Sequence, residues 1–239
     1  VMANALTPDL VAKLESVDTK GKTLTCKLDS GDTLEGDILL VSVGRHANTD
    51  KLNLEAAGLS PNDRKVIGVN EYAQTSKPHI YAIGDVNGLW QLAHVASHQG
   101  LVAVDHIRGG TRRIDNDVVP DCIYTHPQAA EVGLSEEAAR EAGYEVHSAR
   151  FQFAANGRAL TAGHDEGYVK IVGVKRTGRI LGAQIVGPET TELIAPIAVA
   201  MRNQLTVKEL AHTIFAHPTL SEAVMEAAEN FLGEGVHSV

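Results

Sequence analysis

Short apolar and alternating runs open the chain and predict strands over residues 14–17, 23–28 and 33–34. The segments Lys20–Lys22 and Asp29–Asp32 separate these runs. Such clusters of glycine and small polar or charged residues are typical of turns between strands. The beginning of the chain is therefore expected to form a small sheet.

Two continuous apolar runs follow, one over residues 37–44 and the other over residues 79–85. Each reaches a glycine at or near its end, which is the pattern of a strand buried on both faces of a parallel sheet. The sequence thus predicts two buried strands. Gly44 ends the first, and Gly84 and Asp85 end the second. The connection between them is irregular, with a short helix near residues 54–57.

The spacing of apolar residues changes to three and four after residue 91 and predicts a helix over residues 91–107. Gly109 and Gly110 end it, and residues 111–119 are expected to be a linker. Beyond Pro120 the pattern alternates strands with helices. Strands are predicted at 122–124, 130–133, 145–153, 167–174 and 179–186, the last three as an antiparallel meander, and helices after Ser135 and at 191–203, 207–211 and 218–231. The fold class is therefore α/β in the first part and α+β from residue 120 onward.

The composition narrows the range of functions. The chain has 239 residues and a formal net charge of -9, so no broad basic surface would recruit nucleic acid or an anionic membrane. No apolar run reaches the roughly 18 to 20 residues that a membrane helix needs. The first ten residues lack the features of a signal peptide. Cys26 and Cys122 are isolated, which favours a reducing compartment.

The strongest local motif runs from His217 to Glu222. A proline at position 218 is expected to begin a helix, with His217 just before it and Glu222 inside it. A carboxylate beside an imidazole can fix its tautomer and stabilise the imidazolium, which is half of a general acid/base unit. The alternative is a structural histidine packed at a helix start above an exposed glutamate.

Two further motifs are ambiguous from the residues alone. Gly84 and Asp85 at a strand end could receive a ligand, because glycine permits close approach and the carboxylate accepts hydrogen bonds from sugar hydroxyls. An Asx turn after the strand is the alternative. His94 and His98 have a spacing that suits zinc, but no third ligand stands nearby, so we expect no metal site.

Taken in order, eight motifs resemble the C-terminal half of the dihydrolipoamide dehydrogenases, a branch of the flavin-dependent pyridine nucleotide-disulfide oxidoreductases. The resemblance covers nearly the whole chain. The motifs are Val41-Ser-Val-Gly-Arg45 with Asn48, Tyr81-Ala-Ile-Gly-Asp85-Val, Leu92-Ala-His94, Ile123-Tyr-Thr-His-Pro127, Asn156-Gly-Arg158, Ile180-Leu-Gly-Ala183, Gly187-Pro188 with Glu192-Leu-Ile194, and Ala216-His-Pro-Thr-Leu-Ser-Glu222.

This resemblance implies three regions and a set of cofactor contacts. Residues 1–44 would end a Rossmann-like NAD domain, residues 45–119 would be the returning part of the FAD domain, and residues 120–239 would be an interface domain that makes a homodimer. Gly44 would lie at the NAD site. Gly84 and Asp85 would bind FAD, Asp85 through the ribityl chain. The flavin would be lined by Gln91, Leu92, Ala93 and His94.

The resemblance also implies a mechanism and partners. His217 and Glu222 would be the acid/base dyad that serves the partner subunit's redox disulfide, with a cis peptide bond before Pro218. The substrate would be the lipoyl arm of a 2-oxoacid dehydrogenase complex. The expected compartment is the bacterial cytoplasm, or the mitochondrial matrix in a eukaryote.

The chain also departs from the family pattern. The family's flavin fingerprint, its redox cysteine pair and its NAD glycine motif have no counterpart here, so the chain alone is expected to be inactive. Gln99 stands where glutamate is common. The alternatives are another disulfide reductase or a transhydrogenase of the same fold, and a dimerisation module without catalysis. An unrelated α/β binding domain fits the ordered motifs poorly.

Overall fold

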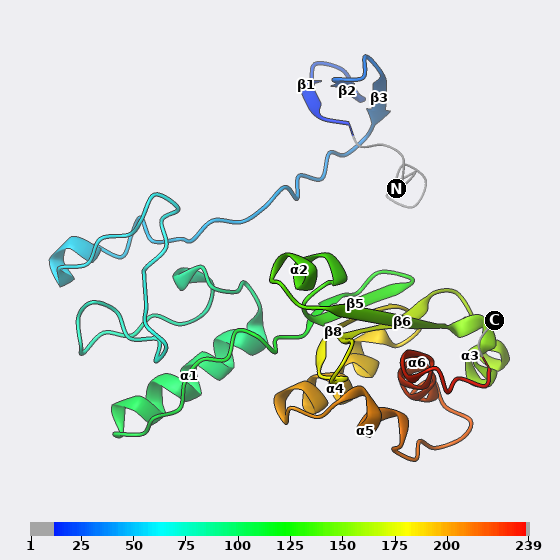
Figure 1. Ribbon diagram of the computed structural model, residues 1–239. Coiled ribbons are helices and arrows are strands. Elements are labelled where there is room, and N and C mark those ends of the chain that lie inside the picture. Colours follow the sequence, from blue (N-terminus) through cyan, green and yellow to red (C-terminus); the bar gives the residue numbers. More distant parts are fainter. Residues whose placement is uncertain (1–11, 238–239) are drawn as a thin grey trace. The chain divides into compact units, whose positions relative to one another are not determined.

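The computed structural model describes residues 12–237. By its internal contacts the chain divides into two compact units, Val1–His46 and Ala47–Val239. Each unit is described by itself below (Figure 1).

The first unit holds a three-stranded antiparallel sheet in the order β1-β2-β3. The strands are β1 Leu14–Asp18, β2 Leu24–Leu28 and β3 Thr33–Gly36. Their turns fall at the predicted clusters, and Gly31 has a φ of +88°, a conformation that favours glycine. The predicted sheet at the beginning of the chain is confirmed.

The buried strand predicted over residues 37–44 is wrong for this chain. No strand is formed there, and Ile38 and Val43 are 87% and 91% exposed. The described residues supply no neighbouring strand for this segment, so its backbone and its apolar side chains have nothing to pair with or pack against. An apolar run forms a buried strand only where neighbouring strands of a sheet pair with it.

The strand predicted over residues 79–85 is also not formed. Tyr81 makes a single antiparallel bridge with Gln74, and the chain then enters a 3-10 turn, η3 Gly84–Asn87. Gly84 has a φ of +73°, which ends the extended conformation. The part of the prediction that holds is the polar turn at its end.

The predicted helices of this region are confirmed. A 3-10 turn, η2, spans Leu54–Ala57, and α1 spans Ala93–Ile107. Gly109 follows α1 with a φ of +86°. Residues 111–119 form the expected irregular linker. Within residues 12–237, no helix has both the length and the apolar character needed to cross a membrane.

A five-stranded antiparallel sheet dominates the rest of the second unit, in the order β4-β5-β8-β7-β6. Its strands are β4 Asp121–Ile123, β5 Gln128–Gly133, β6 Val146–Gln152, β7 Tyr168–Val174 and β8 Ile180–Gly187. The expected meander is confirmed by continuous pairing of β6 with β7 and of β7 with β8. Together with α1 and its preceding turns, this sheet gives the mixed α/β and α+β class.

Helices cover the two faces of the sheet unequally (Figure 1). One face packs on α4 Thr190–Arg202, α5 Val207–Ala211 and α6 Glu222–Leu232. The core between them contains Ile171, Ile185 and Ile197, all fully buried. Burial of each such side chain contributes roughly 1.5–3 kcal/mol. The shorter α2 Glu136–Glu141 packs on the opposite face through Ala139. The sheet, α4 and α5 are thus a stable base for α6.

Side-chain caps fix two helix starts. Ser135 accepts a hydrogen bond from the Ala138 N–H at the start of α2. Thr206 and Glu209 form a reciprocal capping box at the start of α5. The remaining short elements are η4 Phe153–Ala155 and α3 Gly157–Ala162.

The start of α6 differs from the prediction. The helix begins at Glu222, so Pro218 is not its first residue, and Glu222 lies in the first turn rather than deeper inside. The residues between them form a loop because the Thr219 N–H donates to the Glu222 carboxylate. His217–Pro218 is a cis peptide bond, as the resemblance implied.

The lowered pKa of Glu136 on α2 makes the stability of the fold depend on pH. Hydrogen bonds from Lys170 and Ser148, at 2.6 and 2.8 Å, together with the charges of Lys170 and Arg140, lower the pKa of Glu136 to about 2. Because the carboxyl pKa is lower in the folded chain, its stabilisation is complete above the unfolded pKa of about 4.3 and is lost as pH falls towards 2.

We therefore expect Glu136→Gln to lower the free energy of unfolding by about 2 kcal/mol at pH 7, allowing for solvent screening, and by much less near pH 2. Urea unfolding at both pH values measures this. The matched control is Glu145→Gln, whose exposed pair with Lys175 spans 3.7 Å and should matter by less than about 0.5 kcal/mol. Equal losses for Glu136→Gln at both pH values would contradict the assignment.

Candidate functional site

His217 and Glu222 form a hydrogen-bonded pair at the beginning of α6. Nδ1 of His217 lies 2.9 Å from Oε1 of Glu222. The His217 side chain is 78% exposed, whereas the Glu222 side chain is 18% exposed. An accessible imidazole backed by a largely buried carboxylate has the geometry of a general acid/base pair. The two residues that the sequence singled out are therefore brought together.

The pair also determines which ring nitrogen can react. An ionised carboxylate only accepts hydrogen bonds, so the proton of a neutral His217 ring must lie on Nδ1. The Nε2 atom then carries the lone pair, and it makes no hydrogen bond to the described residues. When Nε2 takes up a proton, the carboxylate stabilises the imidazolium. The geometry therefore presents Nε2 as the base.

Glu222 is held in the ionised form by its surroundings. Burial acts to raise its pKa, but the hydrogen bond from the Thr219 N–H and the hydrogen bond and charge of His217 outweigh burial and leave the pKa below its ordinary value. The Thr219 N–H lies 2.8 Å from Oε2. The position at the helix start also favours a negative charge. Both carboxylate oxygens are thus occupied, which fixes the orientation of the group.

Asn156 supports the loop that carries His217, and sequence reasoning gave it no role. Its Nδ2 donates to the Thr219 carbonyl over 3.1 Å, and its Oδ1 accepts from the Ala159 N–H over 2.9 Å. Asn156 is 4% exposed. A buried amide that caps α3 and also holds a distant loop is a positioning residue for His217. The available signal was the Asn156-Gly-Arg158 motif, whose meaning depends on a contact 63 residues away.

Gly84 and Asp85 lie in the turn η3, which is joined to α1 through Gln99. The Gly84 N–H and the Asn87 side chain both donate to Oε1 of Gln99, at 2.7 and 2.8 Å. Gln99 is fully buried, and its Nε2 has no hydrogen-bond partner among the described residues. A Cβ at Gly84 would lie 3.1 Å from the Ala96 side chain. The turn is therefore packed closely on α1, and Asp85 is exposed at its surface.

The other expected flavin contacts lie at the start of α1. Gln91 and Leu92 precede the helix, and Ala93 and His94 form its first turn. Leu92, the residue before the helix, makes no side-chain hydrogen bond to the first N–H groups of the helix. Nε2 of His94 lies 2.9 Å from the Pro120 carbonyl oxygen, which directs the ring to the linker. The turn η3 lies close to this helix, because the Gly84 N–H bonds to Gln99 of α1 and Gly84 lies against Ala96.

Gly44, the residue expected at a nucleotide site, lies in the first compact unit. It is exposed and has a φ of +133°. His217 and Glu222, by contrast, lie in the second unit with Asp85 and His94. The structure describes no group of three or more His, Cys, Asp or Glu side chains within residues 12–237 that is arranged to hold a metal ion.

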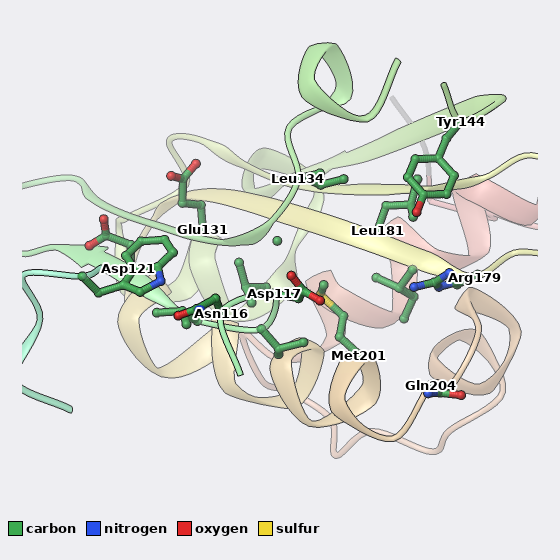
Figure 2. A pocket seen from close by; sticks show the side chains of 16 residues that line it. Asn116, Asp117, Asp121, Glu131, Leu134, Tyr144, Arg179, Leu181, Met201 and Gln204 are labelled. Atoms are coloured by element: carbon green, nitrogen blue, oxygen red, sulfur yellow. The ribbon is translucent and has the colours of Figure 1, made fainter. Parts of the chain in front are cut away.

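A cavity of about 420 Å³ lies beside the sheet and contains none of the predicted site residues (Figure 2). Asp121 and Glu131 lie towards one end and Tyr144 and Arg179 towards the other, with Leu181 between them. No nucleophile with a hydrogen-bonded base is present among its lining residues. The accessible His217 pair therefore remains the better candidate active site.

Known proteins resemble this chain over most of its length. Residues 119–228 match the model of the pyridine nucleotide-disulphide oxidoreductase dimerisation domain, and residues 7–100 match that of pyridine nucleotide-disulphide oxidoreductases. The chain is 44% identical over 222 residues to the dihydrolipoyl dehydrogenase of Haloferax volcanii, and 42% identical over 207 residues to that of Geobacillus stearothermophilus. These matches cover 92% and 87% of the chain, and 47% and 44% of the relatives.

Solved structures give the same result. LpdA of Mycobacterium tuberculosis has a TM-score of 0.85 and 34% identity, covering 92% of this chain and 48% of its own. The HOCl-induced flavoprotein disulfide reductase RclA of Escherichia coli has a TM-score of 0.84 and 28% identity, covering 91% of this chain and 50% of its own. The chain therefore spans about half the length of the relatives that it matches.

Proposed function

Since the chain belongs to the pyridine nucleotide-disulphide oxidoreductases, we propose that it is the C-terminal part of a flavin-dependent dihydrolipoyl dehydrogenase. The complete enzyme would oxidise dihydrolipoamide and reduce NAD⁺. The observation that carries the proposal is the His217–Glu222 pair, with Nε2 exposed and Nδ1 held at 2.9 Å by the carboxylate. A thiol substrate needs such a base, because the thiolate and not the thiol is the nucleophile.

In this mechanism His217 moves the protons of the thiol reaction. Nε2 removes a proton from a thiol of dihydrolipoamide. The resulting thiolate attacks a disulfide of the enzyme, which breaks the S–S bond, forms a mixed disulfide and releases one cysteine as a thiolate. Glu222 stabilises the imidazolium and keeps the ring oriented throughout. Asn156 holds the loop through Thr219, so the ring keeps its place relative to the substrate. Cys26 and Cys122 are both free, and they belong to strands of two different sheets in two separate units, so the redox disulfide would come from the remainder of the enzyme.

Features of the second unit fit FAD. Asp85 is an exposed carboxylate on the turn η3 that could accept hydrogen bonds from ribityl hydroxyls, and Gly84 allows close approach to the backbone. Gln91, Leu92, Ala93 and His94 would line the flavin, beside the helix start that Leu92 leaves uncapped. Gly44 would lie at the NAD site. When bound, FAD supplies the redox chemistry that passes an electron pair from thiol to NAD⁺ as hydride.

We further propose that the enzyme is a homodimer. The match of residues 119–228 to a dimerisation domain supports this. His217 is accessible, as expected for a base that serves a disulfide of the partner subunit. In this proposal residues 1–44 end the NAD domain, residues 45–119 return to the FAD domain and residues 120–239 form the interface domain. The partner would be the lipoyl domain of a 2-oxoacid dehydrogenase complex, in the bacterial cytoplasm or the mitochondrial matrix.

A chimaera tests the proposal. The N-terminal half of a dihydrolipoyl dehydrogenase relative is joined to residues 1–239, and flavin absorbance and NAD⁺-dependent dihydrolipoamide oxidation are measured. We expect a yellow, active dimer, whereas the 239-residue chain alone should show neither flavin nor turnover. A chimaera that dimerises and binds flavin but does not oxidise dihydrolipoamide would support a dimerisation module or another disulfide reductase instead. Robust turnover by the chain alone would also contradict the proposal.

A further inference from the structure

A second cavity, of about 290 Å³, lies between α1, the linker that follows it and the end of α4. It is distinct in its lining from the cavity of Figure 2, with which it shares only Val118 and Val119. One side of it is an apolar wall. The wall consists of Val95, Ile114, Val118, Val119 and Pro120. Such a wall suits a small apolar body with a polar end.

The charged side of this region begins with Arg112 and His98. Nη2 of Arg112 lies 2.6 Å from Nε2 of His98. A guanidinium can only donate, so Nε2 accepts and the His98 ring is neutral. No carboxylate among the described residues lies within ion-pair distance of the Arg112 guanidinium. Arg112 is therefore a positive charge held in place by a neutral base.

Arg202 at the end of α4 lines this cavity itself, whereas Arg112 lines an adjoining open cavity that also contains Arg202. Arg202 pairs with Asp115, whose Oδ1 also accepts hydrogen bonds from the Asp117 and Val118 N–H groups. The adjoining open cavity is lined by three arginines, Arg112, Arg113 and Arg202, and by two carboxylates, Asp115 and Asp117, which leaves one positive charge in excess among its lining residues. In a chain of net charge -9, such a local excess attracts anions. This third, open cavity has a volume of about 470 Å³ and is lined by both Arg112 and Arg202.

The surroundings of His98 lower the pKa of its ring. Burial is the largest cause that lowers its pKa, and the charges of Arg112 and Arg202 lower it further, while Asp115 acts in the opposite direction. His94 also lines the cavity, with its Nε2 at the Pro120 carbonyl oxygen. Arg112 contacts the His98 ring and Arg202 lines the same cavity as that ring, so the two guanidinium groups lie in one region of the surface.

We propose that Arg112 and Arg202 bind a small oxyanion, a phosphate monoester or a carboxylate, whose apolar body occupies the cavity beside Val95 and Ile114. Guanidinium groups pair with both kinds of oxyanion through parallel N–H donors. His98 lines the cavity and is a positioning residue that holds Arg112 beside it. The proposal does not depend on catalysis by this chain, so it can be tested independently of the function proposed above.

Titration of the 239-residue chain by calorimetry and NMR tests this. The probes are phenyl phosphate, benzoate, inorganic phosphate and the neutral benzyl alcohol. We expect phenyl phosphate or benzoate to bind at least 10-fold more tightly than benzyl alcohol, with shifts of the His98 ring and of the Val95 and Ile114 methyl signals. The tighter of the two aromatic anions identifies phosphate or carboxylate as the ligand group. Weaker binding of inorganic phosphate is expected because it lacks the apolar body.

The variants separate a site from a general effect of charge. Arg112→Gln should weaken anion binding at least 10-fold, and Arg202→Gln should do the same. Arg176→Gln removes one exposed positive charge from the turn between β7 and β8 and should change affinity less than 2-fold. Thermal unfolding checks that each variant is folded. Arg202 pairs with Asp115, so if Arg202→Gln disturbs the fold, the result for Arg112→Gln decides the test. Unchanged affinity in Arg112→Gln, equal loss in Arg176→Gln, or no binding of either aromatic anion would overturn the proposal.

Discussion

Replacing His217 by glutamine in the chimaera is expected to lower kcat/KM for dihydrolipoamide by about 10²–10⁴-fold, the usual contribution of a general acid/base. Glutamine keeps a polar side chain on the exposed loop but has no group that takes up a proton near neutral pH. The Glu222 side chain is only 18% exposed and its Oε2 is bonded to the Thr219 N–H, so its carboxylate is poorly placed to replace the lost base. Steady-state kinetics with dihydrolipoamide and NAD⁺ measures the loss.

Two further measurements show whether the loss is specific to proton transfer. Electron transfer from NADH to an artificial acceptor bypasses the thiol step, so it should remain within 2-fold in His217→Gln. Glu222→Gln should fall between the wild type and His217→Gln, because the ring remains but loses its carboxylate. His212→Gln is the control, since its contact with Glu234 spans 3.6 Å outside the pair. A His217→Gln chimaera that keeps more than a fifth of the wild-type kcat/KM would rule out the proton-transfer role.

Gly182→Ala is expected to destabilise the second unit by roughly 3 kcal/mol or more, as overpacking against backbone does. A Cβ at this position of β8 would overlap the Leu134 carbonyl oxygen and lie 2.6 Å from the Leu134 nitrogen. It would also lie 2.8 Å from the Val132 carbonyl oxygen. All three are backbone atoms, so the strand pairing of β5 with β8 must shift to make room.

Urea unfolding followed by circular dichroism measures this loss. Gly157→Ala is the matched control, because a Cβ there meets no atom within 4 Å and its φ is not in the left-handed region. At the first residue of α3 the change to alanine should be neutral or slightly stabilising. Similar stabilities for Gly182→Ala and the wild type would show that β5 and β8 can separate more easily than their packing indicates.

The sequence predicted those parts of the fold that are determined locally. The meander, the caps at Ser135 and Thr206, and the helix over residues 93–107 follow from periodicity and from side chains that bond to the nearest backbone groups. The strands expected at residues 37–44 and 79–85 failed because a buried strand depends on neighbours that lie elsewhere in a sheet. Local pattern carries no information on whether those neighbours are present.

The contacts of the candidate site also separate into local ones, which the sequence predicts, and long-range ones, which it does not. His217 and Glu222 are five residues apart, so their contact could be predicted from the sequence, although the helix was placed four residues too early. The hydrogen bond of Asn156 to Thr219 joins residues 63 apart and could not be predicted. The same holds for His98 and Arg112, whose meeting depends on the path of the linker past α1. Long-range contacts of this kind follow only from the complete fold.

The uncovered segment from Ile38 to Val43 has a practical consequence for handling the chain. It contains no charge, proline or glycine, and five of its six residues are aliphatic. Uncharged stretches of β-forming residues with unpaired backbone groups are templates for intermolecular strand pairing. At high concentration we expect separate copies of the chain to aggregate through strand pairing at this segment. A charged residue introduced there would improve solubility.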